Sequence, residues 1–488
     1  MFFLPKMLNP EKAPEMITEN DIAEIEDKGD AVQQNHATDP HDPLTWSRGR
    51  KLTILLIVGI WILLGTTNMI IIGPALQIVP VEFNASFASS TYLIGGPLLA
   101  YGIASFIWVP LGNRYGVRLV FVVCALIAGC MNCWAAKATS FGSLVAARTL
   151  ASTFYAPPET LAPQMVGDVF HLKDRAKAMS WIGILQASGF AGGPLVGSFI
   201  IQNENLGWRW TEWVLAILTF GTAIGLALLF PETQYTGDHL GMNPQRTWKD
   251  NYNLGYGFLM IFPYFCHPVI LLNMAFFSLC LVVNSYLLTT QSITYLVVYP
   301  FSIGESGLTF IAPLIGTWLA MVFCGILADR LCIRWVKRRG EKPRPEQRLP
   351  LLAITGFIGI AGLILFGVCT QEQCHWIGPL FGSAFVSFCF ICSLSISFAY
   401  LLDVYEARMD TVMVIFNGMK NCAAFGISYA IVPWNTSAGY SVPFGGLAVV
   451  LFVAHVLMLV NYFKGEALRK WAAERFETAR ATHHGDAF

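Results

Sequence analysis

The stretch from Leu52 to Ile72 reads LTILLIVGIWILLGTTNMIII and contains no charged side chain. A helix of about 20 mostly apolar residues is long enough to cross the hydrocarbon core of a bilayer. Eleven further apolar runs follow, so the sequence predicts an all-α membrane protein with twelve transmembrane helices. The predicted spans start near Leu52, Ser89, Leu119, Phe141, Ala178, Trp210, Pro268, Gly307, Leu351, Trp376, Thr411 and Val442.

The composition of the whole chain also indicates a membrane protein. Hydrophobic residues make up 55% of the 488 positions and charged residues only 13%, whereas a soluble domain carries roughly 25% charged residues. A soluble chain of this composition would need a single core of implausible size. Because the formal net charge is zero, nothing points to a nucleic-acid partner, and the expected surroundings are a lipid bilayer.

Basic residues predict the orientation of the spans. They gather at one set of connections, whereas the opposite set has little beyond Lys137 and Arg209. Since Lys and Arg are enriched in cytoplasmic loops, we expect both termini in the cytoplasm and a multi-pass protein of the plasma membrane. The acidic segment 1–50 lacks the pattern of a cleavable signal peptide and is expected to be a disordered tail.

The spans divide into two sets of six. We expect an N-terminal six-helix bundle at 51–230, a central cytoplasmic linker at 231–264, a C-terminal bundle at 265–463 and a cytoplasmic tail at 464–488. The segment Leu111–Arg118 after the second span is echoed by Gly325–Arg334 after the eighth. Repeats at matching topology are typical of transporters, whose substrate site lies between the halves near mid-membrane.

These two segments resemble the signature of the major facilitator superfamily, in which an acid-arginine pair is flanked by a leading glycine and followed by a glycine and a basic residue. The second copy keeps Gly325, Asp329, Arg330 and Arg334, and the first keeps Arg114, Gly116 and Arg118 but has Asn113 in place of the acid. The resemblance implies two pseudo-symmetric six-helix bundles and a loop that latches them at the cytoplasmic side. The missing charge at Asn113 puts in doubt any proton or voltage sensing there. A basic interfacial loop is the alternative interpretation.

The fifth span contains a second motif, made of Gly189, Gly193, Pro194 and Gly197, which resembles that of the drug:proton antiporter branches. Glycines four apart form a stripe that lets a neighbouring helix approach closely, so a general packing groove is the alternative. Asp42–Ser47, Gly207–Trp210, Pro231–Thr233 and Pro345–Leu349 also look like the fungal drug:proton antiporter branch. Its organic-cation and polyamine transporters look nearest.

Two ionisable residues, Arg148 and Glu159, lie within the fourth span, where charges are expensive and usually functional. On one continuous helix they share a face but stand about 16 Å apart, too far to pair directly. Arg148 matches the family's span-four arginine, which the resemblance implicates in proton coupling. Glu159 is our candidate for the protonatable or cation-binding carboxylate, because burial favours the neutral form of a carboxyl group. A charge that holds the following loop is the alternative.

Further polar residues lie within other spans. Lys420 in span eleven is expected to meet a carboxylate or an anionic group of the substrate, with a structural ion pair as the alternative, and Asn417 lies on the same helix face. The remaining candidates are expected either to line a cavity or to join helices by hydrogen bonds: Asn68, Gln186, Asn284 and Tyr286. Cys369 and Cys374 lie close enough in the outer region for a disulfide to form.

The sequence therefore predicts a secondary active transporter that exports small organic compounds, cationic ones included, in exchange for protons by alternating access. Proton-coupled import of an organic cation or polyamine is the second interpretation, and a non-transporting nutrient sensor is the third. No phosphate-binding glycine-lysine loop, catalytic triad or metal-ligand spacing is recognisable, so we expect neither an enzyme nor a cofactor or metal. The expected energy source is the proton gradient, the expected partners are protons and a small-molecule substrate, and the chain is expected to act as a monomer.

Overall fold

The computed structural model describes residues 42–170, 172–233, 255, 258, 261–324, 345–405 and 409–476. All regular secondary structure in these ranges is helical. Ten of the described helices are long and apolar enough to cross a membrane. The fold is therefore the all-α membrane architecture that the sequence predicts.

The first half of the chain contains seven long helices and several short ones. The long helices are α2 (Arg48–Ile70), α4 (Tyr92–Tyr115), α5 (Val117–Ala136), α6 (Phe141–Tyr155), α7 (Pro157–Val169), α8 (Leu172–Gln202) and α9 (Arg209–Leu229). The short ones are α3 (Ile78–Glu82) and the 3-10 turns η1 (Pro43–Thr45), η2 (Gly73–Ala75) and η3 (Phe87–Thr91).

The second half repeats this organisation. Its helices are α12 (Pro268–Val297), α13 (Ile303–Leu308), α14 (Ile311–Val322), α16 (Leu351–Gln371), α17 (Ile377–Val404), α18 (Met409–Ser428), α19 (Ile431–Ala438) and α20 (Ser441–Phe476), with 3-10 turns η4 (Phe262–Cys266) and η6 (Pro345–Arg348). Helices α12 and α16 begin at the residues from which the sequence predicts spans seven and nine.

The two predicted spans outside the ten carry the ionisable residues singled out in the sequence. Span four is divided into α6 and α7, of 15 and 13 residues, because Pro157 and Pro158 cannot donate backbone hydrogen bonds to the preceding turn. Span eleven corresponds to α18, whose 20 residues include the polar Asn417 and Lys420. The total of twelve spans stays a prediction.

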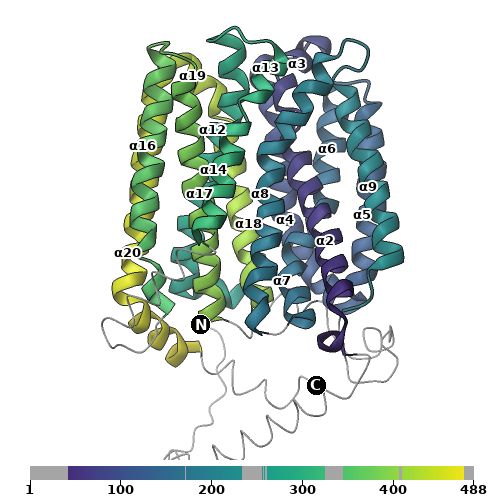
Figure 1. Ribbon diagram of the computed structural model, residues 1–488, viewed down its shortest axis with the longest axis vertical. Helices are drawn as coiled ribbons and strands as arrows, with labels where there is room; N and C mark the ends of the chain where they lie inside the picture. The colour runs from purple at the N-terminus through teal and green to yellow at the C-terminus, as the bar shows by residue number, and fades with distance from the viewer. Residues whose placement is uncertain are drawn as a thin grey trace, which may run out of the picture.

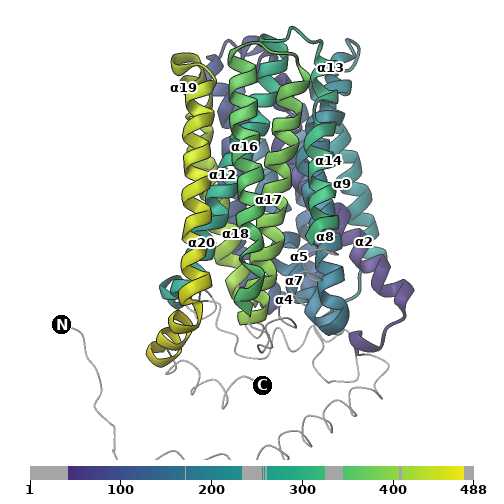
Figure 2. The same cartoon turned by 60° about the vertical axis from the view of Figure 1, so that its left-hand side comes forward.

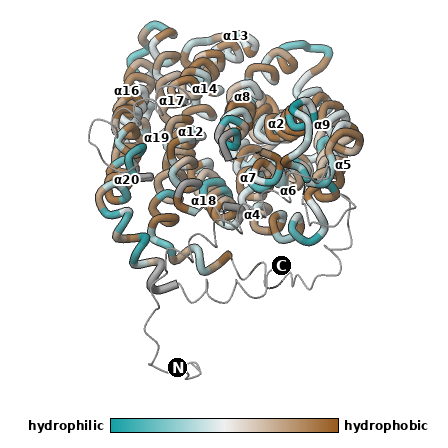
Figure 3. The backbone as a smooth tube through the Cα atoms, turned by 60° about the horizontal axis from the view of Figure 1, so that its bottom comes forward, coloured by the Kyte–Doolittle hydropathy of each residue, from teal (hydrophilic) through white to brown (hydrophobic). Residues whose placement is uncertain are grey.

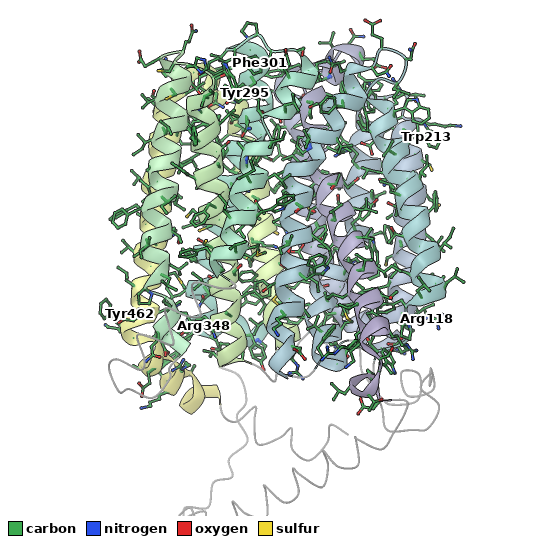
Figure 4. All side chains as sticks on the ribbon, in the orientation of Figure 1. Arg118, Trp213, Tyr295, Phe301, Arg348 and Tyr462 are labelled. Atoms are coloured by element: carbon green, nitrogen blue, oxygen red, sulfur yellow. The ribbon has the colours of Figure 1, made fainter. Side chains whose placement is uncertain are left out.

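The helices stand side by side, with the first half on one side of the bundle and the second half on the other (Figures 1 and 2). The beginning of α2 and the end of α20 lie at the same end of the bundle (Figure 1), which we call the tail end. Arg118 and Arg348 also lie at this end (Figure 4).

Close packing joins the halves along two seams, α4 against α18 and α8 against α13 and α14. A Cβ atom at Gly102 of α4 would lie 2.8 Å from the carbonyl oxygen of Gly418 in α18. On the second seam, the indole of Trp318 donates a hydrogen bond to the Ser188 hydroxyl over 3.1 Å. The backbones on the first seam approach closely because glycine leaves the space free.

Hydrophobic residues cover most of the helices, and hydrophilic ones gather at connections and at the end of α20 (Figure 3). Large apolar side chains are exposed on the outside of the bundle, among them Leu228 (76% exposed), Phe357 (68%) and Phe463 (76%). In water such a surface would be unfavourable, whereas lipid chains match it. Arg148 of α6, Glu159 of α7 and Lys420 of α18 are instead buried.

Candidate functional site

Glu159 of α7 and Lys420 of α18 form an ion pair that joins the two halves of the protein. Only 7% of the Glu159 side chain and 6% of the Lys420 side chain are exposed. Pro157 and Pro158 begin α7 and place Glu159 in its first turn, where the positive end of the helix dipole favours a carboxylate. The pair therefore links one bundle to the other through charges that are buried from solvent.

The surroundings of this pair are polar on one side and aromatic on the other. The side-chain amide of Asn417 donates to the backbone carbonyl of Glu159 over 3.4 Å. The Lys420 ammonium lies 5.7 Å from the centroid of the Phe277 ring, which stacks with the rings of Phe390 and Phe416 at 5.4 and 4.7 Å. The arrangement brings the predicted residues Glu159, Asn417 and Lys420 together in one place.

A second ion pair, Arg148 with Glu212, is fully buried inside the first half. Arg148 comes from α6 and Glu212 from the first turn of α9. The guanidinium also donates to the backbone carbonyls of Asn68, over 2.5 Å, and Leu93, over 3.3 Å. Since each of the three guanidinium nitrogens donates to a different helix, the pair ties α6 to α2, α4 and α9.

The polar contacts continue toward the tail end of the first half. The hydroxyl groups of Tyr155 and Thr219 are hydrogen-bonded, and the Asn132 amide donates to Tyr155 over 2.7 Å. Tyr155 and Thr219 each follow a member of the ion pair by seven residues, about two helical turns. The same faces of α6 and α9 therefore meet twice, once through charges and once through hydroxyl groups.

Glu212 is the residue that sequence reasoning missed. It lies two residues after the predicted start of span six at Trp210, where a charge is easily assigned to the membrane interface. The sequence did contain a signal. An acid stands at the edge of the apolar run of span six, and Arg148 in span four needs a counter-charge within the membrane. The separation expected for Arg148 and Glu159 holds only for one continuous helix, whereas the helix is interrupted at Ala156. Each of these two residues has its own partner.

The other polar candidates have hydrogen-bond partners other than Glu159 and Lys420. Asn68 donates to the Ser152 hydroxyl over 3.0 Å, and Asn284 accepts from Ser387 over 3.4 Å. Tyr286 donates to Asn435 over 2.8 Å. Gln186 is half-buried in α8, and its backbone carbonyl accepts from Thr66 over 3.0 Å. Asn68, Asn284 and Tyr286 thus make hydrogen bonds that join helices, and their role in lining a cavity stays a prediction.

The loop of the first signature is held within the first half. Gly116 has φ +87°, a conformation that glycine adopts without strain, and Glu232 accepts from the backbone N–H groups of Val117 and Arg118 over 3.2 and 3.1 Å. Further contacts are those of Asn113 with Gln164 (3.0 Å), Arg114 with the Tyr115 ring (5.5 Å) and Arg118 with the Ala227 carbonyl (2.8 Å). Glu232 therefore places a negative charge at the start of α5, where backbone N–H groups lack partners within the helix. Gly325, Asp329, Arg330 and Arg334 of the second copy lie outside the described residues.

The glycine motif of span five packs α8 against α2. A Cβ atom at Gly189 would collide with the Thr66 hydroxyl and lie 2.6 Å from the Leu63 carbonyl oxygen, and one at Gly197 would collide with the Ile71 carbonyl. At Gly193 the nearest atom would be the Thr67 carbonyl oxygen at 3.2 Å. Within the same motif, the Pro194 carbonyl accepts a hydrogen bond from Ser198 over 2.8 Å. The stripe is a close helix contact inside the first half.

Cys369 and Cys374 are free thiols in the structure. They flank the end of α16, where the Cys374 backbone N–H donates to the Cys369 carbonyl over 2.9 Å. Their proximity is therefore explained by a turn of the backbone without a covalent bond.

A family model described as Major Facilitator Superfamily matches residues 56–429 of the chain. The chain belongs to the major facilitator superfamily. This member is 31% identical over 460 residues to the MFS transporter cpaT of Aspergillus oryzae, a match that covers 88% of this chain and 90% of that protein. It is 24% identical to the efflux pump radE of Floropilus chiversii, over 92% of this chain and 86% of that protein.

A solved structure of the same superfamily supports the fold. The proton:xylose symporter XylE, bound to 6-bromo-6-deoxy-D-glucose, aligns with a TM-score of 0.63 and 15% identity over 86% of this chain and 97% of that one. The family and the relatives together identify this superfamily member as a multi-pass membrane transporter and not an enzyme.

Proposed function

We propose that this transporter exports small organic compounds in exchange for protons, by alternating access of the two halves. We place both termini in the cytoplasm, following the distribution of its basic residues, and the protein in the plasma membrane. The observation that carries the proposal is the buried ion pair between Glu159 and Lys420, because it makes the contact between the halves depend on the charge of one carboxyl group.

Protonation of Glu159 removes one of the two charges that attract each other across the halves. In surroundings of low dielectric constant this attraction is strong, and an unpaired buried charge is unfavourable. A proton on Glu159 therefore favours arrangements in which the halves have moved apart at this point and Lys420 has reached other partners or water. Proton binding is thereby connected to conformation without any covalent chemistry.

The Arg148–Glu212 pair has a different place in this scheme. Both of its members belong to the first half, and both side chains are fully buried. Relative movement of the halves leaves such a pair intact, so we assign it to holding α6, and with it the following α7, in position. Glu159 is then carried by a rigid support.

The ion pair works in either direction of transport, so support for the proposed direction comes from the relatives. One relative is named an efflux pump, and this favours export. Import of an organic cation or polyamine coupled to protons is the second candidate.

One assay separates the two directions. Cells that express the chain, and matched cells without it, are given labelled lipophilic amines with and without an imposed pH gradient. Export predicts lower accumulation and higher resistance to toxic amines, and loss of the difference when the gradient is abolished. Accumulation driven by acid outside indicates import, and an equal label in both cell lines contradicts the proposal.

A further inference from the structure

Three features around the Lys420 ammonium each suit a positively charged amine. The Glu159 carboxylate supplies the opposite charge. The Phe277 ring lies 5.7 Å away, within the range at which a ring face attracts a cation. Asn417, one helical turn before Lys420, is fully buried, and its Oδ1 accepts no hydrogen bond from the described part of the chain. The site thus offers a charge, a ring face and a spare acceptor.

The two members of the ion pair differ in how easily they can move. Glu159 has a short side chain in the first turn of α7, directly after Pro157 and Pro158. Lys420 carries its charge at the end of a flexible four-carbon stem. The carboxylate is therefore the fixed member and the ammonium the movable one.

We propose that the position of the Lys420 ammonium is the recognition site for a protonated amine of the substrate, and that Lys420 is a tethered competitor for it. This inference rests on the proposed function, in which substrate binds between the halves. The substrate class is an alkylammonium compound that bears a flat aromatic group. Its N–H donors would serve Glu159 and Asn417, and its ring would meet the stacked rings of Phe277, Phe390 and Phe416.

An anionic substrate fits this environment less well. It would have to draw Lys420 away from Glu159 and would leave that carboxylate buried without its partner. It would also face aromatic rings, whose faces carry partial negative charge. The spare acceptor on Asn417 would gain nothing from a carboxylate.

The tethered competitor has a consequence for coupling. With neither substrate nor proton bound, Lys420 occupies Glu159 and holds the halves together at this point. Either a substrate amine or a proton at Glu159 displaces Lys420 and releases the link. The empty, deprotonated transporter is therefore the state least able to change conformation, which prevents the pH gradient from being dissipated without transport.

The test measures binding to the purified full-length protein with two fluorescent probes that share one fluorophore. Dansylcadaverine carries an alkylammonium group, and dansylglycine carries a carboxylate. Because Lys420→Gln removes a competitor held at high effective concentration, it should tighten dansylcadaverine binding by about tenfold. Lys420→Arg keeps a tethered cation and should leave binding weak. Lys177→Gln, at a lysine whose side chain is 84% exposed, controls for the substitution itself.

Glu159→Gln should abolish dansylcadaverine binding in every background. Weaker or unchanged dansylcadaverine binding by Lys420→Gln overturns the proposal. The proposal is also overturned if dansylcadaverine binds neither the wild-type protein nor the variant. Dansylglycine binding that disappears in Lys420→Gln overturns it in favour of an anion site. Since binding is measured without a pH gradient, a transporter that proves not to be proton-coupled can still pass or fail this test.

Discussion

Lys420 of α18 and Glu159 of α7 form an ion pair across the two halves of the protein, with both side chains more than nine-tenths buried. Reversing one charge places two like charges together, and removing a partner from a buried pair destabilises a protein by about 3–5 kcal/mol. We therefore expect Glu159→Lys and Lys420→Glu to lower the unfolding temperature of the purified protein, and the double variant to recover most of the loss. A double variant as unstable as the single ones would show that the two side chains do not interact.

The Arg148–Glu212 pair should be a larger determinant of folding than of coupling. Glu212→Gln leaves the Arg148 guanidinium fully buried without a counter-charge, and we expect a loss of about 3–5 kcal/mol. Glu204→Gln, at an exposed position, is the matched control and should have little effect. The measurement is thermal unfolding in detergent, and equal stability of the two variants would remove the role given to Glu212.

The glycines of α8 can be compared within one helix. Gly189→Ala forces a methyl group against Thr66 and the Leu63 carbonyl, and overpacking of this kind destabilises by about 1–3 kcal/mol. Gly192→Ala meets no atom within 4 Å and should be neutral or slightly stabilising, because alanine is the better helix former. The expected order of unfolding temperatures is therefore Gly192→Ala at or above wild type and Gly189→Ala below. Similar values for both variants would contradict the packing of α8 on α2.

An ion pair outside the spans gives a pH-dependent prediction. Glu82 accepts hydrogen bonds from the Trp208 indole over 2.6 Å and from Arg209 over 2.5 Å. Partial burial acts to raise the pKa of Glu82, but the two hydrogen bonds and the Arg209 charge together hold the pKa below its ordinary value. The folded protein therefore favours the charged form more than the unfolded chain does.

The sign of the effect follows from this difference. The stabilisation is present above the ordinary glutamate pKa of about 4.3 and is lost as the pH falls through the lower pKa of the folded state. Because the pair is partly exposed, Glu82→Gln should cost about 0.5–1 kcal/mol at neutral pH. Unfolding temperatures of wild type and variant should converge in acid below that range. A difference that grows on acidification would contradict the assignment.

Ten of the predicted spans are found as long apolar helices, because each is encoded locally by an apolar run bounded by proline, glycine or charge. Proline marks the start of α12 at Pro268, for example. The residues that carry charge within the spans were recognised by the same local rule, with the exception of Glu212 at the edge of its run.

Pairing of these residues is not encoded locally. Lys420 could be expected to meet a carboxylate, but only the packing of α7 against α18 shows that this carboxylate is Glu159. In the same way, Asn284 and Tyr286 have the polarity of cavity-lining residues, and only the neighbouring α17 and α19 show that their hydrogen bonds join helices. Contacts between distant segments decide the site.

Gradient-driven transport by Glu159→Gln in proteoliposomes is the most direct test of the claim that the Glu159 carboxyl group couples transport to protons. Wild-type protein should move a labelled lipophilic amine against its concentration when a pH gradient is imposed. Glu159→Gln cannot exchange a proton at this position and should lose that transport while remaining folded and monodisperse, whereas Glu159→Asp should retain part of it. Wild-type rates of gradient-driven transport by Glu159→Gln would contradict the account.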